Sequence, residues 1–433
     1  MLLSQSTLRL QPNNTLHYKS VSSQPRGIQL KMCTCPEQWK NDEEIQIFQE
    51  YLRIPTVHPD VDYTACVEFL KRQASNLNLP VDVVYPVVPS KPVVIMKWLG
   101  QQPELKSIIL NSHMDVVPVF PEKWTHEPFG AHIDAQGRIY ARGAQDMKSV
   151  GCQYMAAVRA LKASGYQPKR TVYLTFVPDE ETGGEMGMAE FVQGDYFKAM
   201  NVGFSLDEGI ASEDDSYPVF YAERTSWHLR FKFSGTSGHG SLLHKSTAGE
   251  KFHYVMDKLM KFRETQVKLL TADSALHIGD VTTLNLTQLH GGVQSNVVPP
   301  VLEATFDIRI AINQDADVLE KQIHEWCNEV GGGVALDFTL KCPSVVTKID
   351  ASNPYWLGFK RGLDELGLRT HTRVFPGATD SFYVRQVGIP ALGFSPINNT
   401  PVLLHNHDEY LRADTYLHGI QVYRKLIPSI ADS

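Results

Sequence analysis

The sequence of 433 residues predicts an α/β protein, long enough to form two domains. We expect a mostly parallel sheet flanked by helices, because short apolar strands alternate with helical segments. Three of these strands end in a cluster of carboxylates or histidines, at the edge where open sheets of this class bind ligands. Between about residues 222 and 341 the order changes to β-α-β-β-α-β, which predicts an inserted ferredoxin-like α+β domain.

The composition excludes several classes of protein. Hydrophobic residues make up 42% of the chain, and the net charge is −7. The sequence lacks the basic stripe with interleaved aromatic residues that is typical of nucleic-acid binding. It also lacks an apolar run of the roughly 20 residues needed to cross a membrane. The six cysteines are too few and too scattered for a disulfide framework, so we expect a reducing compartment, the cytoplasm.

Residues 1–35 differ from the rest of the chain. They contain four basic residues and several serines but no Asp or Glu, which weakly resembles a transit peptide. A continuous apolar segment of the length that a secretory signal needs is missing from this stretch. We therefore expect a disordered extension.

Periodicity and capping signals define the elements that follow the extension. Before the insertion we expect helices over 41–52, 63–77 and 147–164, two β-rich runs within 81–99, and strands over 107–110, 171–177 and 202–206. Inside the insertion we expect strands over 227–233, 281–289, 304–312 and 334–340, with helices over 247–270 and 317–330. After it, Asn353-Pro354 opens a helix, a strand covers 391–394, and a helix covers 415–430.

The apolar strand 171–177 ends in the acidic octet Val177–Gly184. Adjacent carboxylates at the end of a buried strand repel each other unless each has its own partner. We interpret Glu181 as a metal ligand and Glu180 as a free general base. The alternative is a solvated acidic turn.

Similar residues follow other elements. His113 and Asp115 come after the strand 107–110, and their spacing suits an imidazole that a neighbouring carboxylate orients. Asp146 lies between a loop and a helix, where the alternative to metal binding is a helix N-cap. Glu208 follows the strand 202–206, and His405 lies near the end of the chain. Two imidazoles with several carboxylates suit zinc, or cobalt or manganese in its place.

Longer motifs extend this pattern. The chain contains SHMDVVP, ARGAQDMK, VPDEETGG, LDEG, SGHGS and LLHNHDEY. Together they resemble the dizinc metallopeptidase family of glutamate carboxypeptidases and desuccinylases, over about residues 48–430. The resemblance implies a catalytic domain in two parts (36–221 and 342–433) and a lid or dimerisation domain (222–341). It also implies two Zn²⁺ per subunit.

The resemblance assigns a role to each metal-ligand candidate. Asp146 would bridge the two ions, with His113 and Glu208 on one of them and Glu181 and His405 on the other. His405 and His407 compete for one ligand position. The ligand histidine of the family lies four residues before a glutamate, which selects His405, because Glu409 follows it at that spacing.

Further residues would act on the substrate. In the family pattern Glu180 is the catalytic base and Asp115 is the partner of His113. The lid would supply His239, Asn296 and a carboxylate-binding Arg309. The predicted strand 304–312 agrees with the role of Arg309, because this residue alternates with apolar neighbours that face the core.

In sequence, the motifs most resemble those of family members that hydrolyse N-acyl-L-amino acids to a carboxylate and a free L-amino acid. We expect a small-molecule substrate of that class and a homodimer formed through the lid. A dipeptidase or carboxypeptidase on the same scaffold is the alternative activity. A non-catalytic protein that kept the fold would be expected to lack ligands or the base, whereas all five ligand positions and Glu180 are present.

Overall fold

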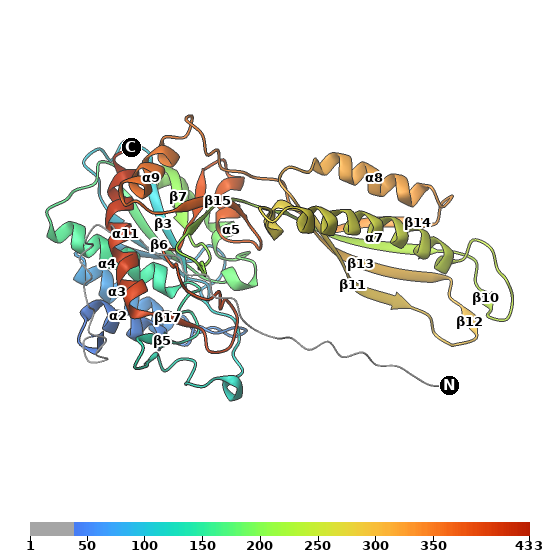
Figure 1. Cartoon of the computed structure of the whole chain (residues 1–433), viewed down its shortest axis with the longest axis horizontal. Coiled ribbons are helices and arrows are strands. Elements are labelled where there is room, and N and C mark those ends of the chain that lie inside the picture. Colours follow the sequence, from blue (N-terminus) through green and yellow to red (C-terminus); the bar gives the residue numbers. More distant parts are fainter. Residues whose placement is uncertain (1–38) are drawn as a thin grey trace, which may run out of the picture. The chain divides into compact units, whose positions relative to one another are not determined.

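Eight strands form one sheet in the computed structural model, which describes residues 39–433 (Figure 1). The extension expected over residues 1–35 lies outside the described residues. In order across the sheet the strands are β1 (Val81–Val84), β2 (Val93–Trp98), β6 (Val172–Val177), β3 (Ser107–His113), β7 (Val202–Asp207), β16 (Ala391–Gly393), β8 (Tyr217–Glu223) and β15 (Thr370–Phe375).

The centre of this sheet is parallel, which confirms the predicted class. β3 pairs in parallel with both β6 and β7, and β7 pairs in parallel with β16. Antiparallel pairs join β2 to β1 and to β6, and β16 to β8. The carboxyl ends of β3, β6 and β7 therefore meet at one edge.

Helices cover both faces of the sheet, because alternate residues of its strands point to opposite sides. Ile108 and Leu110 pack in one core cluster, whereas Ile109 packs in another. The first face carries α2 (Glu43–Leu52), α3 (Thr64–Asn76), α4 (Lys148–Ala163), α9 (Pro354–Glu365) and α11 (Ala413–Ala431). The second face carries α5 (Met188–Phe191), α6 (Asp195–Ala199) and α10 (Ser381–Gln386).

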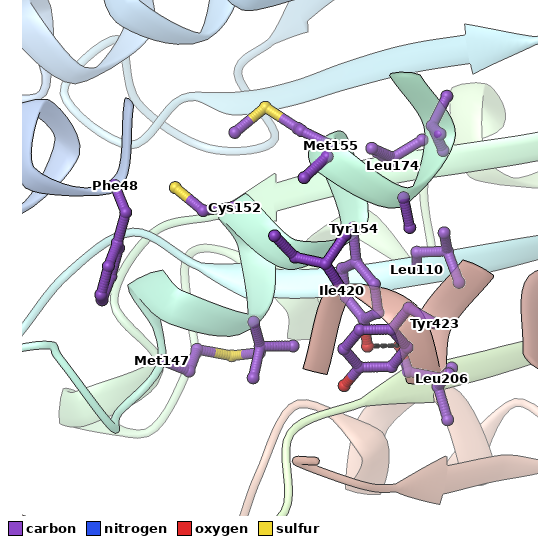
Figure 2. Close-up of a cluster of buried hydrophobic side chains, with 14 of the residues drawn as sticks. Phe48, Leu110, Met147, Cys152, Tyr154, Met155, Leu174, Leu206, Ile420 and Tyr423 are labelled. Carbon is purple, nitrogen blue, oxygen red and sulfur yellow. Dashed lines mark hydrogen bonds between the residues drawn. The ribbon is translucent and has the colours of Figure 1, made fainter. Parts of the chain in front are cut away.

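Helix α4 is buried between the sheet and α11 (Figure 2). Its Tyr154 hydroxyl donates to the main-chain oxygen of Leu206 on β7 at 3.3 Å, and its ring lies 4.6 Å from that of Tyr423 on α11. This packing fixes the start of α4, which follows Asp146, against the strands that carry the other acidic residues.

The inserted segment forms a second sheet of four antiparallel strands in the order β11-β13-β9-β14. Along the chain its elements are β9 (Thr225–Ser234), α7 (Ala248–Ala272), β11 (Thr283–Gly291), β13 (Val301–Ile310), α8 (Ala316–Asn328) and β14 (Val334–Lys341). This is the ferredoxin-like order predicted from the sequence. Thr247 and Glu250 form the expected capping box at the start of α7.

Several strands were not expected. β8 continues in the large sheet to Glu223, beyond the boundary placed after residue 221, and its Pro218 weakened the strand signal. β15 is a half-buried edge strand with polar residues, so it lacks a clear apolar pattern. The others are very short: β4 (His132–Ile133), β5 (Arg138–Tyr140) and β17 (Tyr410–Arg412) form one small sheet, and β10 (Gly238–His239) pairs with β12 (Val297–Val298).

Among residues 39–433, every helix is too short or too polar to cross a lipid bilayer. In the core of the large-sheet part, α11 packs against both α4 and α9. α9 packs against α11 at Gly358, where an added Cβ would overlap with the main-chain oxygen of Ser429. The absence of a side chain at this position therefore sets the distance between the two helices.

Gly358→Ala is expected to lower the free energy of unfolding by about 1–3 kcal/mol, because α9 must move away from α11. Urea unfolding followed by circular dichroism measures the change. Gly249→Ala is the matched control, since the only atom near its added Cβ is Thr247 Oγ1 at 3.9 Å. Alanine there is expected to leave stability unchanged or slightly higher. A loss of the same size at both positions would contradict the packing argument.

Candidate active site

The acidic and histidine residues predicted from the sequence meet at one edge of the large sheet. His113 ends β3, Glu180 and Glu181 follow β6, and Glu208 follows β7. The three strands are parallel neighbours, so their ends bring these side chains together. Asp146 precedes α4, and the loop before β17 supplies His405 to the same cluster.

Asp146 lies at the centre of the cluster. Its Oδ1 is 3.0 Å from Nε2 of His113, and its Oδ2 is 3.2 Å from Nε2 of His405. The same His405 nitrogen lies 3.0 Å from Oε2 of Glu181, and Oε2 of Glu208 lies 3.7 Å from Nε2 of His113. One carboxylate therefore contacts both imidazoles, and each imidazole contacts a second carboxylate.

The alternative roles considered for these acids do not fit the geometry. The N-cap of α4 is Met147, which makes no side-chain cap bond, so Asp146 does not cap that helix. The side chain of Glu181 is only 5% exposed, so it does not belong to a solvated acidic turn. Both carboxylates are instead buried against imidazoles.

Asp115 holds the turn that presents the two adjacent glutamates. The turn is a short 3-10 helix, η2 (Glu180–Thr182), and it follows Asp179, whose φ of +57° lies in the left-handed region. The Asp115 carboxylate accepts hydrogen bonds from the main-chain N–H groups of Glu180 at 3.2 Å and Glu181 at 3.1 Å. The buried Asp115 therefore orients both glutamates through their backbone.

The contact between His113 and Asp115 is mainly through the main chain. Nδ1 of His113 lies 2.9 Å from the Asp115 carbonyl oxygen and 3.6 Å from its carboxylate. This contact leaves Nε2 of His113 directed at Asp146. The Asp115 carboxylate has another imidazole partner, His58, at 2.7 Å. Sequence reasoning missed His58, because no motif surrounds it.

A buried ion pair supports the loop that carries His405. The Glu409 carboxylate accepts a hydrogen bond from Arg142 at 2.7 Å and one from the main-chain N–H of Gln145 at 2.6 Å. Arg142 also donates to the main-chain oxygen of His405 at 3.2 Å. His405 has a φ of +61°, which a non-glycine residue adopts only when its surroundings impose it. Glu409 was noted only for its spacing, and its pairing with Arg142 was not expected.

The pKa values of the carboxylates in the cluster are shifted in different directions. Burial raises the pKa of Glu180, and the nearby Glu208 carboxylate raises it further. Burial, followed by the charge of Asp146, raises the pKa of Glu208. Burial acts in the same direction on Asp146, but hydrogen bonds from His113 and the other imidazole prevail and lower its pKa. The cluster therefore holds more negative charge than its two imidazoles can neutralise.

The residues present fit a divalent metal centre. Oε1 of Glu181 is buried and has no hydrogen-bond partner in residues 39–433. Two sets of donor atoms lie within 4.8 Å of one another: His113, Glu180 and Glu208 form the first, and His113, Asp146 and Glu181 form the second. Imidazole nitrogens combined with carboxylate oxygens suit zinc, cobalt or manganese better than magnesium or calcium.

The cluster opens into a cavity of about 930 Å³. Its lining includes Glu180, Glu181 and His405 from the large-sheet part of the chain, and Arg309 from β13. Arg309 points away from the buried residues of β13, as the alternation predicted. Its guanidinium donates to the Asp307 carboxylate, with both Nε and Nη2 at 2.9 Å.

Two of the residues expected to act on the substrate, the catalytic His239 and the substrate-binding Asn296, lie elsewhere. His239 on β10 is exposed, its Nδ1 lies 2.7 Å from Ser241 Oγ, and it does not line this cavity. Asn296 lies next to it, since its main-chain oxygen accepts from Gly240 at 2.7 Å. His407, the alternative to His405, packs its ring edge-on against Phe120 instead of reaching the cluster.

Comparisons with known proteins agree with the fold and the motifs. The model of the family described as peptidase family M20/M25/M40 matches residues 109–429. Human aminoacylase-1 is 47% identical over 388 residues, which cover 89% of this chain and 95% of that protein. Aminoacylase-1 of Dictyostelium discoideum is 40% identical over 406 residues, with 91% and 98% covered.

A solved structure supports the fold alone. A dinuclear metal-binding peptidase of the M20 family from Bacillus subtilis superposes with a TM-score of 0.66 at 14% identity, and the match covers 90% of this chain and 98% of that one. The family expected from the sequence motifs is confirmed. The chain belongs to peptidase family M20/M25/M40, and the aminoacylase-1 proteins are among its relatives.

Proposed function

We propose that this protein is a metal-dependent amidohydrolase that converts N-acyl-L-amino acids to a carboxylate and a free L-amino acid. One observation carries the proposal: a chain that is 47% identical to human aminoacylase-1 folds its acids and imidazoles into a single cluster beside Glu180. The cavity next to this cluster, of about 930 Å³, is large enough for a small amide substrate.

Five residues are proposed to hold two Zn²⁺, with Co²⁺ or Mn²⁺ as possible substitutes. Asp146 is the shared ligand, a role supported by its contacts with both imidazoles. His113 and Glu208 hold one ion, and Glu181 and His405 hold the other. When bound, zinc lowers the pKa of water from about 15.7 toward about 7 and polarises a carbonyl oxygen.

Glu180 is the proposed general base. Its carboxylate lines the cavity beside Glu208, and the raised pKa that follows from burial suits a group that both accepts and returns a proton. Glu180 accepts a proton from the water that attacks the acyl carbonyl carbon. It then delivers this proton to the departing nitrogen as the C–N bond breaks. Asp115 supports these steps by holding the main chain of Glu180.

Lid residues are proposed to bind the substrate. The Arg309 guanidinium lines the cavity and can form charge-assisted hydrogen bonds with the substrate carboxylate. His239 is proposed to stabilise the oxyanion that develops on the acyl carbonyl, and Asn296 to bind next to it. Because His239 does not line the cavity of its own chain, we propose that it acts in the site of a partner subunit.

A homodimer through the lid would meet this requirement. β11 is an edge strand of the four-stranded sheet, and an exposed edge can pair with a strand of a second copy. Leu286, Leu289 and Val293, on β11 and the loop after it, expose apolar side chains.

The proposed location of the protein is the cytoplasm, because its few scattered cysteines suit a reducing compartment. Cell fractionation tests this proposal.

The substrate class is tested with N-acetyl-L-methionine against dipeptides that contain methionine. The zinc-loaded protein is expected to hydrolyse the N-acetyl compound with the higher kcat/KM. Chelation is expected to abolish the activity, and added Zn²⁺ to restore it, since the cluster without metal cannot activate water. Faster hydrolysis of the dipeptides would favour the alternative dipeptidase or carboxypeptidase.

Glu180→Gln is expected to lower kcat by about 10²–10⁴-fold while the metal content stays the same, because the amide cannot accept a proton. Metal analysis and steady-state kinetics on the same sample measure both quantities. The matched control is Glu190→Gln on α5, where the side chain is exposed, and it is expected to keep full activity. Full activity of Glu180→Gln would exclude Glu180 as the base.

Subunit complementation tests the role of His239. Glu180→Gln and His239→Ala are expected to be nearly inactive alone, and co-expression is expected to restore activity. In the mixed dimer, one site combines an intact Glu180 from one chain with an intact His239 from the other. Sedimentation checks that the active species contains two chains. A mixed dimer without activity would contradict the proposal that His239 acts across the interface.

A further inference from the structure

Arg224 is a buried cation at the junction of the two sheets. It lies between β8 of the large sheet and β9 of the four-stranded sheet, and it is only 8% exposed. It lines the same cavity as Glu180 and Arg309. No motif in the sequence marks it, and the roles proposed above do not use it.

Within the described part of the chain, the guanidinium of Arg224 donates hydrogen bonds only to neutral oxygens. Nη2 donates to the main-chain oxygen of Pro376 at 2.8 Å. Nη1 donates to Oγ1 of Thr283 at 3.1 Å and to the main-chain oxygen of Val281 at 3.4 Å. A guanidinium has five N–H donors, so these three bonds leave two of them free. One is on Nε, which is buried and has no partner in residues 39–433.

The other buried arginines are neutralised. Arg142 forms an ion pair with Glu409 at 2.7 Å, and Arg385 forms one with Glu223 at 3.1 Å. No carboxylate oxygen of the described part of the chain lies within 4.0 Å of the Arg224 nitrogens. A buried charge without a counter-charge is costly, so this position calls for an anion.

The neighbouring Arg309 does not neutralise the positive charge of Arg224. In the β11–β13 pair Thr283 lies opposite Arg309, so the hydrogen bond from Arg224 to Thr283 brings the two guanidiniums close. Burial lowers the pKa of Arg224 and the charge of Arg309 lowers it further, whereas the charge of Asp307 acts in the opposite direction without prevailing. Arg309 is already bound by Asp307, with the shortest contacts at 2.9 Å. The pair of arginines therefore keeps one uncompensated positive charge.

The lining of the cavity contains charged side chains of both signs. Glu180, Glu181 and Glu208 belong to the cluster described above, whereas Arg224 lies at the junction of the two sheets. Asp307 and Glu223 also line the cavity, but they are paired with Arg309 and Arg385. An anionic group is attracted by the guanidinium of Arg224, which has no carboxylate partner of its own. A substrate with one carboxylate is therefore expected to place it at the arginines, with the acyl amide toward Glu180.

We propose that Arg224 binds the carboxylate of the substrate and that this carboxylate supplies the counter-charge that the chain lacks. The identity of the substrate as an N-acyl amino acid rests on the function proposed above. N-acetyl-L-methionine is the suitable probe, because its only carboxylate is the α-carboxylate. Its amide, N-acetyl-L-methioninamide, has the same shape without the charge.

Calorimetric titration of the zinc-loaded Glu180→Gln protein separates binding from turnover. Adding Arg224→Gln in this background is expected to weaken binding of the acid by about 10- to 100-fold, the loss expected for charge-assisted hydrogen bonds. Affinity for the amide is expected to stay the same. Arg309→Gln, measured in the same way, reports the contribution of the neighbouring guanidinium. Equal weakening of acid and amide, or no change for either, would overturn the role of Arg224.

Arg230→Gln is the matched control, since Arg230 lies on the exposed face of β9, pairs with Asp337 at 2.7 Å and does not line the cavity. It is expected to change the affinity for neither ligand. If Arg224→Gln does not fold, Arg224→Lys keeps the charge and the same comparison applies: loss for the acid alone supports the proposal, and equal loss for both overturns it. Failure of the proposed function would appear separately, as absence of N-acetyl-L-methionine hydrolysis by the wild-type protein.

Discussion

The repulsion among buried carboxylates is the constraint on which this structure depends. Parallel strands bring Glu180, Glu181 and Glu208 to one edge of the sheet, and Asp146 joins them from the start of α4. Two imidazoles cannot neutralise four carboxylates, so the remaining negative charge is balanced by a bound cation or by protons. The surrounding elements hold each carboxylate in place, and within residues 39–433 none of the four forms an ion pair with a lysine or arginine.

The main features of the fold and of the site could be predicted because their signals are local. β3, β6 and β7 each contain a short apolar run, and His113, Glu180, Glu181 and Glu208 lie at the ends of these strands or directly after them. A parallel arrangement then places those residues together without any knowledge of tertiary contacts. The capping box at Thr247 and the outward position of Arg309 on β13 were equally readable, because helix caps and strand alternation depend on near neighbours in sequence.

The remaining features depend on contacts between distant residues. His58 reaches Asp115 across 57 positions, and Arg142 reaches Glu409 across 267, so neither pair leaves a local pattern. β15 was missed because a half-buried edge strand carries polar residues. The environment of Arg224 was equally hidden, since its isolation from carboxylates becomes visible only when two sheets and the loop at Pro376 are brought together.

The position of β16 has a consequence for synthesis of the protein on the ribosome. This strand comes late in the chain, at Ala391–Gly393, yet it lies between β7 and β8 in the large sheet. A nascent chain that has not reached these residues therefore lacks an interior strand, and it also lacks His405. The inserted ferredoxin-like segment precedes β16 in the chain, so all four strands of its sheet have been synthesised before β16. The cluster of acids and imidazoles can accordingly be completed only after nearly the whole polypeptide has been made.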